Sequence, residues 1–317
     1  MNAQRHSFVL VCMLASLLAP AGPCRTSAEE PAADELPATR PSVQKPADRS
    51  WVAHMQEVHR KFKGKPGTLA FFGDSITVTM AFWCPLTSKK LQNVSPEMAK
   101  DLALVKGYLA KECWREWKGP KFGNNGRMKI DWAHANVDTW LNTMNPEAAL
   151  IMFGTNDLKK RGNLLNYEKN YREVIRKCLD NGTIVILHTI PPFHRRADIS
   201  GQYADVVRKL AKEMNLPVSD YYAEVMRRRP EDWSGKMEKF KLPEPPQPQT
   251  RPKRRRRGSN ADVDTLIGRD GVHPSYPAKY KLDFSEESLN CSGYNLRSYL
   301  ALTIYADVVR SALKLEK

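Results

Sequence analysis

The sequence has few cysteines, no visible internal repeat and no apolar run of membrane-spanning length. Its six cysteines in 317 residues do not follow the spacing of a metal site. Three neighbouring residues, Asn260, Asp262 and Asp264, lack the glycine and the distal glutamate that an EF-hand calcium loop needs. The apolar stretch from Phe8 to Leu18 is too short to span a membrane comfortably. We therefore expect no metal, no cofactor and no membrane span.

That apolar stretch lies in the pattern of a secretory signal. Arg5 and His6 precede it, and small residues and prolines follow it. We predict a signal peptide over residues 1–28 and therefore an exported protein, either periplasmic or secreted. A lipid anchor on Cys24 is less favoured, because Pro23 directly precedes this cysteine where a lipidation site prefers a small residue.

Beyond the signal, the composition changes twice. Residues 29–49 contain Pro, Ala and Glu with little periodicity, which predicts a disordered linker before a folded domain at 50–317. Within that domain, residues 241–260 carry seven Lys or Arg against the single Glu244, a large part of the formal net charge of +15. This Pro/Arg-rich segment predicts a solvated loop, in which Arg251 to Arg257 could make weak contact with anionic polymers.

Four cysteines remain once the signal is removed: Cys84, Cys113, Cys178 and Cys291. In an oxidising compartment Cys84 could pair with Cys113. Buried free thiols are about equally consistent with so few cysteines, so the sequence predicts no particular disulfide.

Short apolar runs alternate with amphipathic segments in the folded domain. Strands covered by helices on both faces lose the polar alternation of half-exposed strands, so we interpret these runs as buried parallel strands. The runs are residues 68–72, 148–153, 183–188 and a weaker one at 216–220.

Two segments have apolar residues at the spacing of a helix face. The first helix is expected to end at Asn181-Gly182, and the second to pack back on the sheet. Alternating strands and helices predict a doubly wound α/β sandwich with right-handed crossovers. The first face consists of Tyr167, Tyr171, Val174, Ile175, Cys178 and Leu179, and the second of Leu296, Leu300, Ile304, Val308 and Ala312.

A turn sequence follows each of the first two predicted strands. Gly73-Asp74-Ser75 follows one, and Gly154-Thr155-Asn156-Asp157 follows the other. Because ligands bind outside the carboxyl ends of parallel strands, both turns are expected on one functional rim. Asp74 and Asp157 are expected to accept hydrogen bonds from backbone amides and so to hold these turns.

A third segment, GRDGVHPSYP, places Asp270 three residues before His273. A serine hydroxyl becomes a good nucleophile when an imidazole takes its proton, and a carboxylate fixes the tautomer of that imidazole. We therefore predict Ser75, Asp270 and His273 as catalytic residues.

A fourth segment, FGNNGRMKIDW, supplies a loop glycine whose N–H can approach a substrate closely. Gly126 is the preferred candidate and Gly123 is its rival. Together with the N–H of Ser75 and the side-chain amide of Asn156, the N–H of Gly126 would form an oxyanion hole of three donors.

These four segments, in this order, resemble the motif blocks of SGNH hydrolases, also called GDSL esterases and lipases. The matching positions are Ser75, Gly126, Asn156 and His273. The resemblance covers residues 66 to 314 and implies a flavodoxin-like, three-layer α/β/α sandwich with a mainly parallel sheet. It differs at the glycine block, where Arg127 follows Gly126 in place of a small residue.

The resemblance and the residues together predict an exported serine ester hydrolase. We expect it to remove short acyl groups, especially O-acetyl groups, from carbohydrate. One alternative is a lipase or lysophospholipase-type esterase, and another is a non-catalytic module that binds acidic polymers. His194, Arg195 and Arg196 could meet an anionic substrate group, although a solvated basic loop is the simpler interpretation. Trp83, Trp114, Trp117 and Trp132 are expected mainly in the core, with one or two as a wall for stacking sugars.

Overall fold

The computed structural model describes residues 49–118, 123, 126–160, 162–240 and 263–313. The predicted signal peptide (1–28), the linker at 29–49 except Arg49, and the basic loop at 241–260 lie outside the described residues. Within the described ranges, no helix is both long enough and apolar enough to cross a membrane.

Four parallel strands form one sheet, in the order in which they occur along the chain. Three of them are buried at every position, as their apolar runs predicted. The strands are β1 (Leu69–Gly73), β2 (Ala148–Met152), β3 (Ile184–His188) and β4 (Val218–Ser219).

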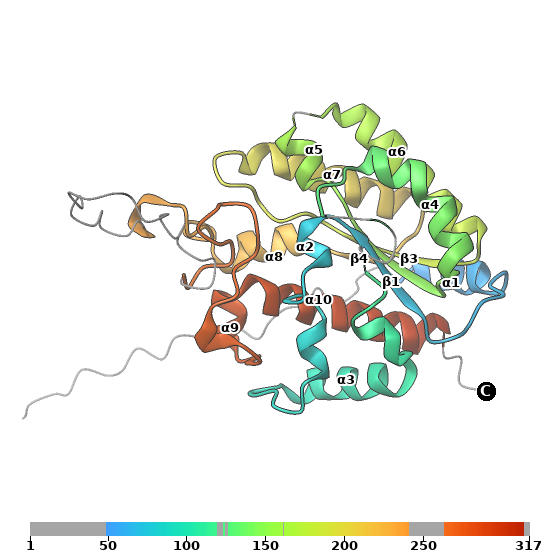
Figure 1. Ribbon diagram of the computed structural model, residues 1–317, viewed down its shortest axis with the longest axis horizontal. Helices are drawn as coiled ribbons and strands as arrows, with labels where there is room; N and C mark the ends of the chain where they lie inside the picture. Colours follow the sequence, from blue (N-terminus) through green and yellow to red (C-terminus); the bar gives the residue numbers. More distant parts are fainter. Residues whose placement is uncertain (1–48, 119–122, 124–125, 161, 241–262, 314–317) are drawn as a thin grey trace, which may run out of the picture. The chain divides into compact units, whose positions relative to one another are not determined.

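The helix that directly precedes each of β2, β3 and β4 lies on the same face of the sheet, because the crossovers pass in the same direction (Figure 1). These helices are α4 (Ile130–Met144), α6 (Leu164–Asp180) and α7 (Ala197–Glu213), and α6 packs against both of the others. The side chains predicted for the inner face of α6 are buried, except that Leu179 is half-buried.

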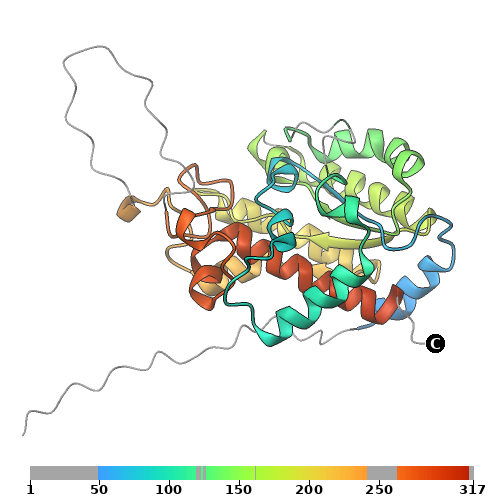
Figure 2. The ribbon, with the colours of Figure 1, turned by 60° about the horizontal axis from the view of Figure 1, so that its bottom comes forward.

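The opposite face is covered by α1 (Trp51–His59), α3 (Pro96–Tyr108) and the C-terminal helix α10 (Gly293–Val308). Figure 2 shows α10 running alongside α3. The predicted three-layer α/β/α sandwich is therefore confirmed.

The outer edge of β1 also makes a backbone contact. The N–H of Phe71 donates to the carbonyl oxygen of Trp117 at 3.0 Å. In the flavodoxin-like strand order 2-1-3-4-5, a further strand lies at this edge. Within the described residues, the segment at Trp117 lies at this edge.

Shorter elements connect the layers and carry most of the polar side chains discussed below. The remaining short α-helices are α2 (Ser75–Val78), α5 (Thr155–Lys159), α8 (Tyr221–Arg228) and α9 (Glu286–Cys291). The single turns are η1 (Cys84–Thr87), η2 (Lys111–Trp114), η4 (Glu238–Phe240), η5 (Ala278–Tyr280) and η6 (Val309–Leu313).

Helix α10 is buried on nearly all sides, whereas the sequence predicted a single apolar stripe. Ile304, a member of that stripe, is only half-buried, and the polar Arg297 is fully buried. The Arg297 guanidinium donates to the carbonyl oxygen of Ile76 at 2.7 Å and to the hydroxyl of Thr77 at 2.9 Å, and it lies 3.8 Å from the centre of the Phe82 ring. Arg297 thus connects α10 to α2.

We predict that Arg297→Met lowers the free energy of unfolding by about 3 kcal/mol, because the carbonyl of Ile76 and the buried Asp74 lose their cationic neighbour. Chemical denaturation measures this loss. Arg310→Met is the matched control: it removes a half-exposed ion pair with Asp101 at 2.6 Å and should cost at most about 1 kcal/mol. Equal losses in the two variants would contradict the assigned role of Arg297.

Candidate active site

The turn after β1 places Ser75 at the first position of α2. Asp74 caps this helix, since its carboxylate accepts a hydrogen bond from the N–H of Ile76 at 3.0 Å. Asp74 is fully buried, and burial raises its pKa to about 6, although the N–H of Ile76 and the charge of Arg297 oppose the shift. The expectation that Asp74 holds its turn is confirmed.

A second turn, far along the chain, brings His273 to the hydroxyl of Ser75. The Oγ of Ser75 lies 2.9 Å from Nε2 of His273, and Nδ1 of His273 lies 2.6 Å from Oδ2 of Asp270. The other carboxylate oxygen of Asp270 accepts hydrogen bonds from the N–H groups of Val272 and His273 at 2.9 and 3.0 Å. The carboxylate is therefore held by its own turn in the orientation that meets the imidazole.

Gly271 makes this turn possible. Its φ of +72° is a conformation that other residues adopt only with strain. A Cβ at this position would lie 2.6 Å from the Cβ of His194, so the site is also closed to a side chain by its neighbours.

The pKa of His273 is raised, first because of its hydrogen bond to Asp270 and then because of the negative charges of Asp270 and Asp74. Burial and the charge of Lys159 act in the opposite direction. A carboxylate that stabilises the protonated imidazole is one of the usual causes of such a shift.

Two of the three expected oxyanion donors point at a single oxygen atom. The N–H of Ser75 donates to the carbonyl oxygen of Gly126 at 2.8 Å, and the side-chain amide of Asn156 donates to the same oxygen at 3.2 Å. Asn156 also donates to the carbonyl oxygen of Met128 at 3.0 Å. The donors therefore converge at a point beside the Ser75 hydroxyl, and a carbonyl oxygen of the chain occupies it.

Gly126 lies against Ser75, and its carbonyl oxygen faces the two other expected donors. A Cβ on Gly126 would lie 3.1 Å from the Cα of Ser75, and the φ of Gly126 is +84°. A Cβ on the rival, Gly123, would meet nothing within 4 Å. We expected Gly126 to present its N–H, and in this structure its carbonyl oxygen faces Ser75 and Asn156.

Asp157 also behaves as expected, since it holds backbone and does not reach Ser75. Its carboxylate accepts from the N–H of Ile130, the first residue of α4, at 3.2 Å. Burial raises the pKa of Asp157 to about 7, an effect that the N–H of Ile130 partly offsets. The turn at 154–157 is thereby joined to α4, the helix that follows Gly126 in the chain.

Most of the tryptophans are in the core. Trp83, Trp114 and Trp117 are buried, and Trp83 stacks on Trp114 with ring centres 5.2 Å apart. Trp132 is half-buried and packs against Trp140. The three buried rings offer no wall for sugar stacking.

None of the four cysteines in the described ranges forms a disulfide, so Cys84 and Cys113 do not pair. Elsewhere in these ranges, no cluster of three His, Cys, Asp or Glu side chains is arranged to hold a metal ion.

The sequence analysis did not identify Arg297, which donates hydrogen bonds to Ile76 and Thr77, the two residues after Ser75. Its only signal was a single arginine inside the apolar pattern of the last helix. Burial lowers the pKa of Arg297 to about 10, so the side chain stays charged at neutral pH.

Comparison with known proteins agrees with the order of these segments. Residues 71–277 match the GDSL-like Lipase/Acylhydrolase family. The chain therefore belongs to this family, and it is classed as a carboxylic ester hydrolase. No curated protein sequence matches the chain.

Several solved structures are similar to this chain at low identity. An acetyl xylan esterase, AlAXEase, is 22% identical over 51% of this chain and 80% of its own, with a TM-score of 0.38. A family 3 carbohydrate esterase from Clostridium thermocellum is 15% identical over 76% of this chain and 96% of its own, with a TM-score of 0.43. A catalytic mutant of Axe2, an acetylxylan esterase from Geobacillus stearothermophilus, is 16% identical over 77% of this chain and 96% of its own, with a TM-score of 0.43.

We predict that Asp270→Asn lowers the pKa of His273, because a neutral amide replaces the charged carboxylate that raises it. Titration of the His273 ring by NMR measures the change. Asp138→Asn, which alters an exposed carboxylate paired with Lys177, is the control and should leave the His273 titration in place. An unchanged His273 pKa in Asp270→Asn would mean that Asp270 does not set it.

Proposed function

We propose that this protein hydrolyses esters through a nucleophilic Ser75. The hydroxyl of Ser75 attacks the ester carbonyl carbon while Nε2 of His273 takes the proton, and Asp270 holds the imidazole and stabilises its protonated form. His273 then gives the proton to the leaving alcohol, and water, activated by the same imidazole, releases the acid from Ser75. The observation that carries this proposal is the continuous chain of contacts from Ser75 through His273 to Asp270, at 2.9 and 2.6 Å.

The oxyanion is held, in this proposal, by the N–H of Ser75 and the side-chain amide of Asn156. Both donors already meet at one oxygen, the Gly126 carbonyl, which stands where a substrate oxyanion would lie. Catalysis then requires the substrate oxygen to replace this carbonyl. Rotation of the peptide between Gly126 and Arg127 would remove it, and the absence of a side chain on Gly126 leaves room for that change beside Ser75.

The reaction also has a defined pH dependence. His273 must be unprotonated to accept the Ser75 proton, and its pKa is raised. Activity is therefore expected to rise with pH through a value above the ordinary histidine pKa of about 6.5.

For the substrate, we propose short acyl groups, O-acetyl above all, on carbohydrate. The described surface exposes three large apolar side chains: Met80, Leu165 and Ile199. Each methylene of a long acyl chain gains about 0.8 kcal/mol only where apolar surface can cover it. So little exposed apolar surface favours a short acyl group over the fatty chain of the alternative, a lysophospholipid-type substrate.

We also propose that the protein is exported, on the composition of residues 1–28 described above. Export would bring the enzyme to polysaccharides outside the cytoplasm. The second alternative, a binding module without catalysis, would not require the Ser75, His273 and Asp270 contacts together.

We predict that Ser75→Ala abolishes hydrolysis of p-nitrophenyl acetate and labelling by a fluorophosphonate probe, because both need the Ser75 hydroxyl. Thr79→Ala, a hydroxyl deletion just beyond α2, is the control and should retain both. Undiminished hydrolysis in purified Ser75→Ala would rule out the proposed nucleophile. Release of acetate from acetylated xylan, compared with fatty acid from lysophosphatidylcholine, distinguishes the two substrate classes.

We predict that Asn156→Ala lowers kcat by about 10²- to 10³-fold with little change in KM, since the lost donor acts on the developing oxyanion. Steady-state kinetics on p-nitrophenyl acetate measures both constants. Asn166→Ala is the control on α6, where the side chain contacts Asp131 at 3.2 Å, and should be close to the unaltered enzyme. A change confined to KM would remove Asn156 from the proposed oxyanion hole.

A further inference from the structure

Three cationic side chains lie around the turn that carries His273, on the rim at the carboxyl ends of the strands. Lys159 ends α5, three residues after Asn156, Arg195 lies in the segment between β3 and α7, and Lys236 follows a buried Ser234-Gly235 pair. All three are exposed, and none has an acidic partner within the described residues. Their charge is therefore available to a ligand.

The segments that carry Arg195 and Lys236 pack directly on the turn that contains Asp270 and His273. The N–H of His194 donates to the carbonyl oxygen of Gly271 at 2.9 Å. A Cβ on Gly271 would lie 2.9 Å from Cδ of Lys236 as well as 2.6 Å from the Cβ of His194. The side chains of His194 and Lys236 thus both lie close to Gly271, and Arg195 follows His194 in the chain.

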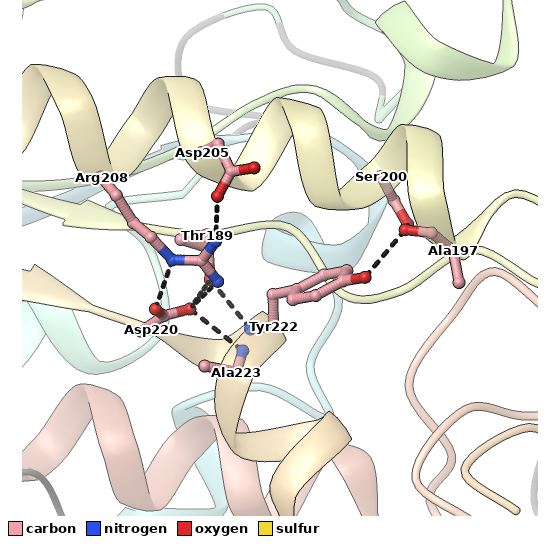
Figure 3. A network of polar contacts seen from close by, with 8 residues as sticks. All are labelled: Thr189, Ala197, Ser200, Asp205, Arg208, Asp220, Tyr222 and Ala223. Atoms are coloured by element: carbon pink, nitrogen blue, oxygen red, sulfur yellow. Dashed lines mark hydrogen bonds and ion pairs between the residues drawn. The ribbon is translucent and has the colours of Figure 1, made fainter. Parts of the chain in front are cut away.

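The segment that carries His194 and Arg195 is fixed at both ends (Figure 3). At its start, the hydroxyl of Thr189 donates to Asp220 at 3.0 Å. At its end, the hydroxyl of Tyr222 donates to the carbonyl oxygen of Ala197 at 2.8 Å. Arg208 neutralises Asp220 in the same network at 2.6 Å, so this carboxylate does not offset the rim cations.

The charges of these cations affect the pKa values of two histidines, His194 and His273. The pKa of His194 is lowered, first by burial and then by the charges of Lys236 and Arg195. The charge of Lys159 opposes the upward shift of the His273 pKa. The one carboxylate at this turn, Asp270, is already bonded to His273 and to two backbone amides.

We propose that the ester substrate carries an anionic group, a carboxylate or a sulfate, near the acyl ester, and that Lys159, Arg195 and Lys236 bind it. The substrate class is thus an acylated acidic carbohydrate. This inference rests on the proposed ester hydrolysis. It replaces the interpretation of the 194–196 segment as a merely solvated loop.

The test compares acetyl esters that share the acyl group but differ in the charge of the leaving phenol. The probes are 4-acetoxybenzoate, its neutral methyl ester and 4-acetoxybenzenesulfonate, with acetylated polygalacturonate and acetylated xylan as polymers. The measured quantity is the ratio of kcat/KM for the anionic probe to that for the neutral probe, after each kcat/KM is divided by the rate constant for spontaneous hydrolysis of that ester. We expect a ratio above one that falls as salt is added, with the benzoate and sulfonate arms showing whether carboxylate or sulfate is preferred.

Each of Lys159→Gln, Arg195→Gln and Lys236→Gln should lower this ratio about two- to fivefold, the effect of one partly screened charge, and the triple variant should lower it further. Lys212→Gln is the matched control, because Lys212 is an exposed lysine in the last turn of α7 and should leave the ratio unaltered.

A ratio near one, in an enzyme whose hydrolysis of the neutral ester depends on Ser75, would overturn the anionic substrate and leave the proposed function standing. Equal ratios in the rim variants and in Lys212→Gln would overturn the assignment of these cations. Hydrolysis of none of the esters would overturn both the inference and the proposed function.

Discussion

The register between β1 and β2 is the constraint on which the candidate site depends. Gly73 pairs with Met152, so the turns that follow the two strands leave the sheet at the same level. This is why the N–H of Ser75 and the amide of Asn156, far apart in the sequence, reach one oxygen atom. A slip of one residue would turn every side chain of a strand to the other face of the sheet and separate these donors.

Beneath this rim the protein buries charges that a core normally excludes. Asp74 is tolerated because a backbone amide and the guanidinium of Arg297 compensate part of its desolvation. Arg297 in turn fixes α2 through the carbonyl of Ile76 and the hydroxyl of Thr77. The turn carrying Ser75 is thus held by the Asp74 cap and by Arg297 of α10. These contacts favour a fixed position for the Ser75 hydroxyl.

Local patterns were sufficient to predict the strands, the inner face of α6 and the residues that meet at the rim. Ser75, Asp270 and His273 could be chosen because their short motifs follow strands or contain the required carboxylate spacing. The direction of the Gly126 peptide could not be chosen, since a glycine allows both orientations and the surrounding contacts decide between them. Arg297 was missed for a related reason: its surroundings come from α2 and Phe82, far along the chain, and one helix pattern does not contain that information.

The chain between Asn156 and His273 adds long-range contacts around the candidate site. Backbone hydrogen bonds join Gly235 to Ile267 and Gly268 to His273, so the segment bearing Lys236 is connected to the turn bearing His273. The turn that places His273 within hydrogen-bonding distance of Ser75 is therefore connected to a segment that carries a cation, Lys236. Replacing the Lys236 side chain removes no backbone group, so the proposed preference for charged substrates can be tested separately from the Ser75 to His273 contact.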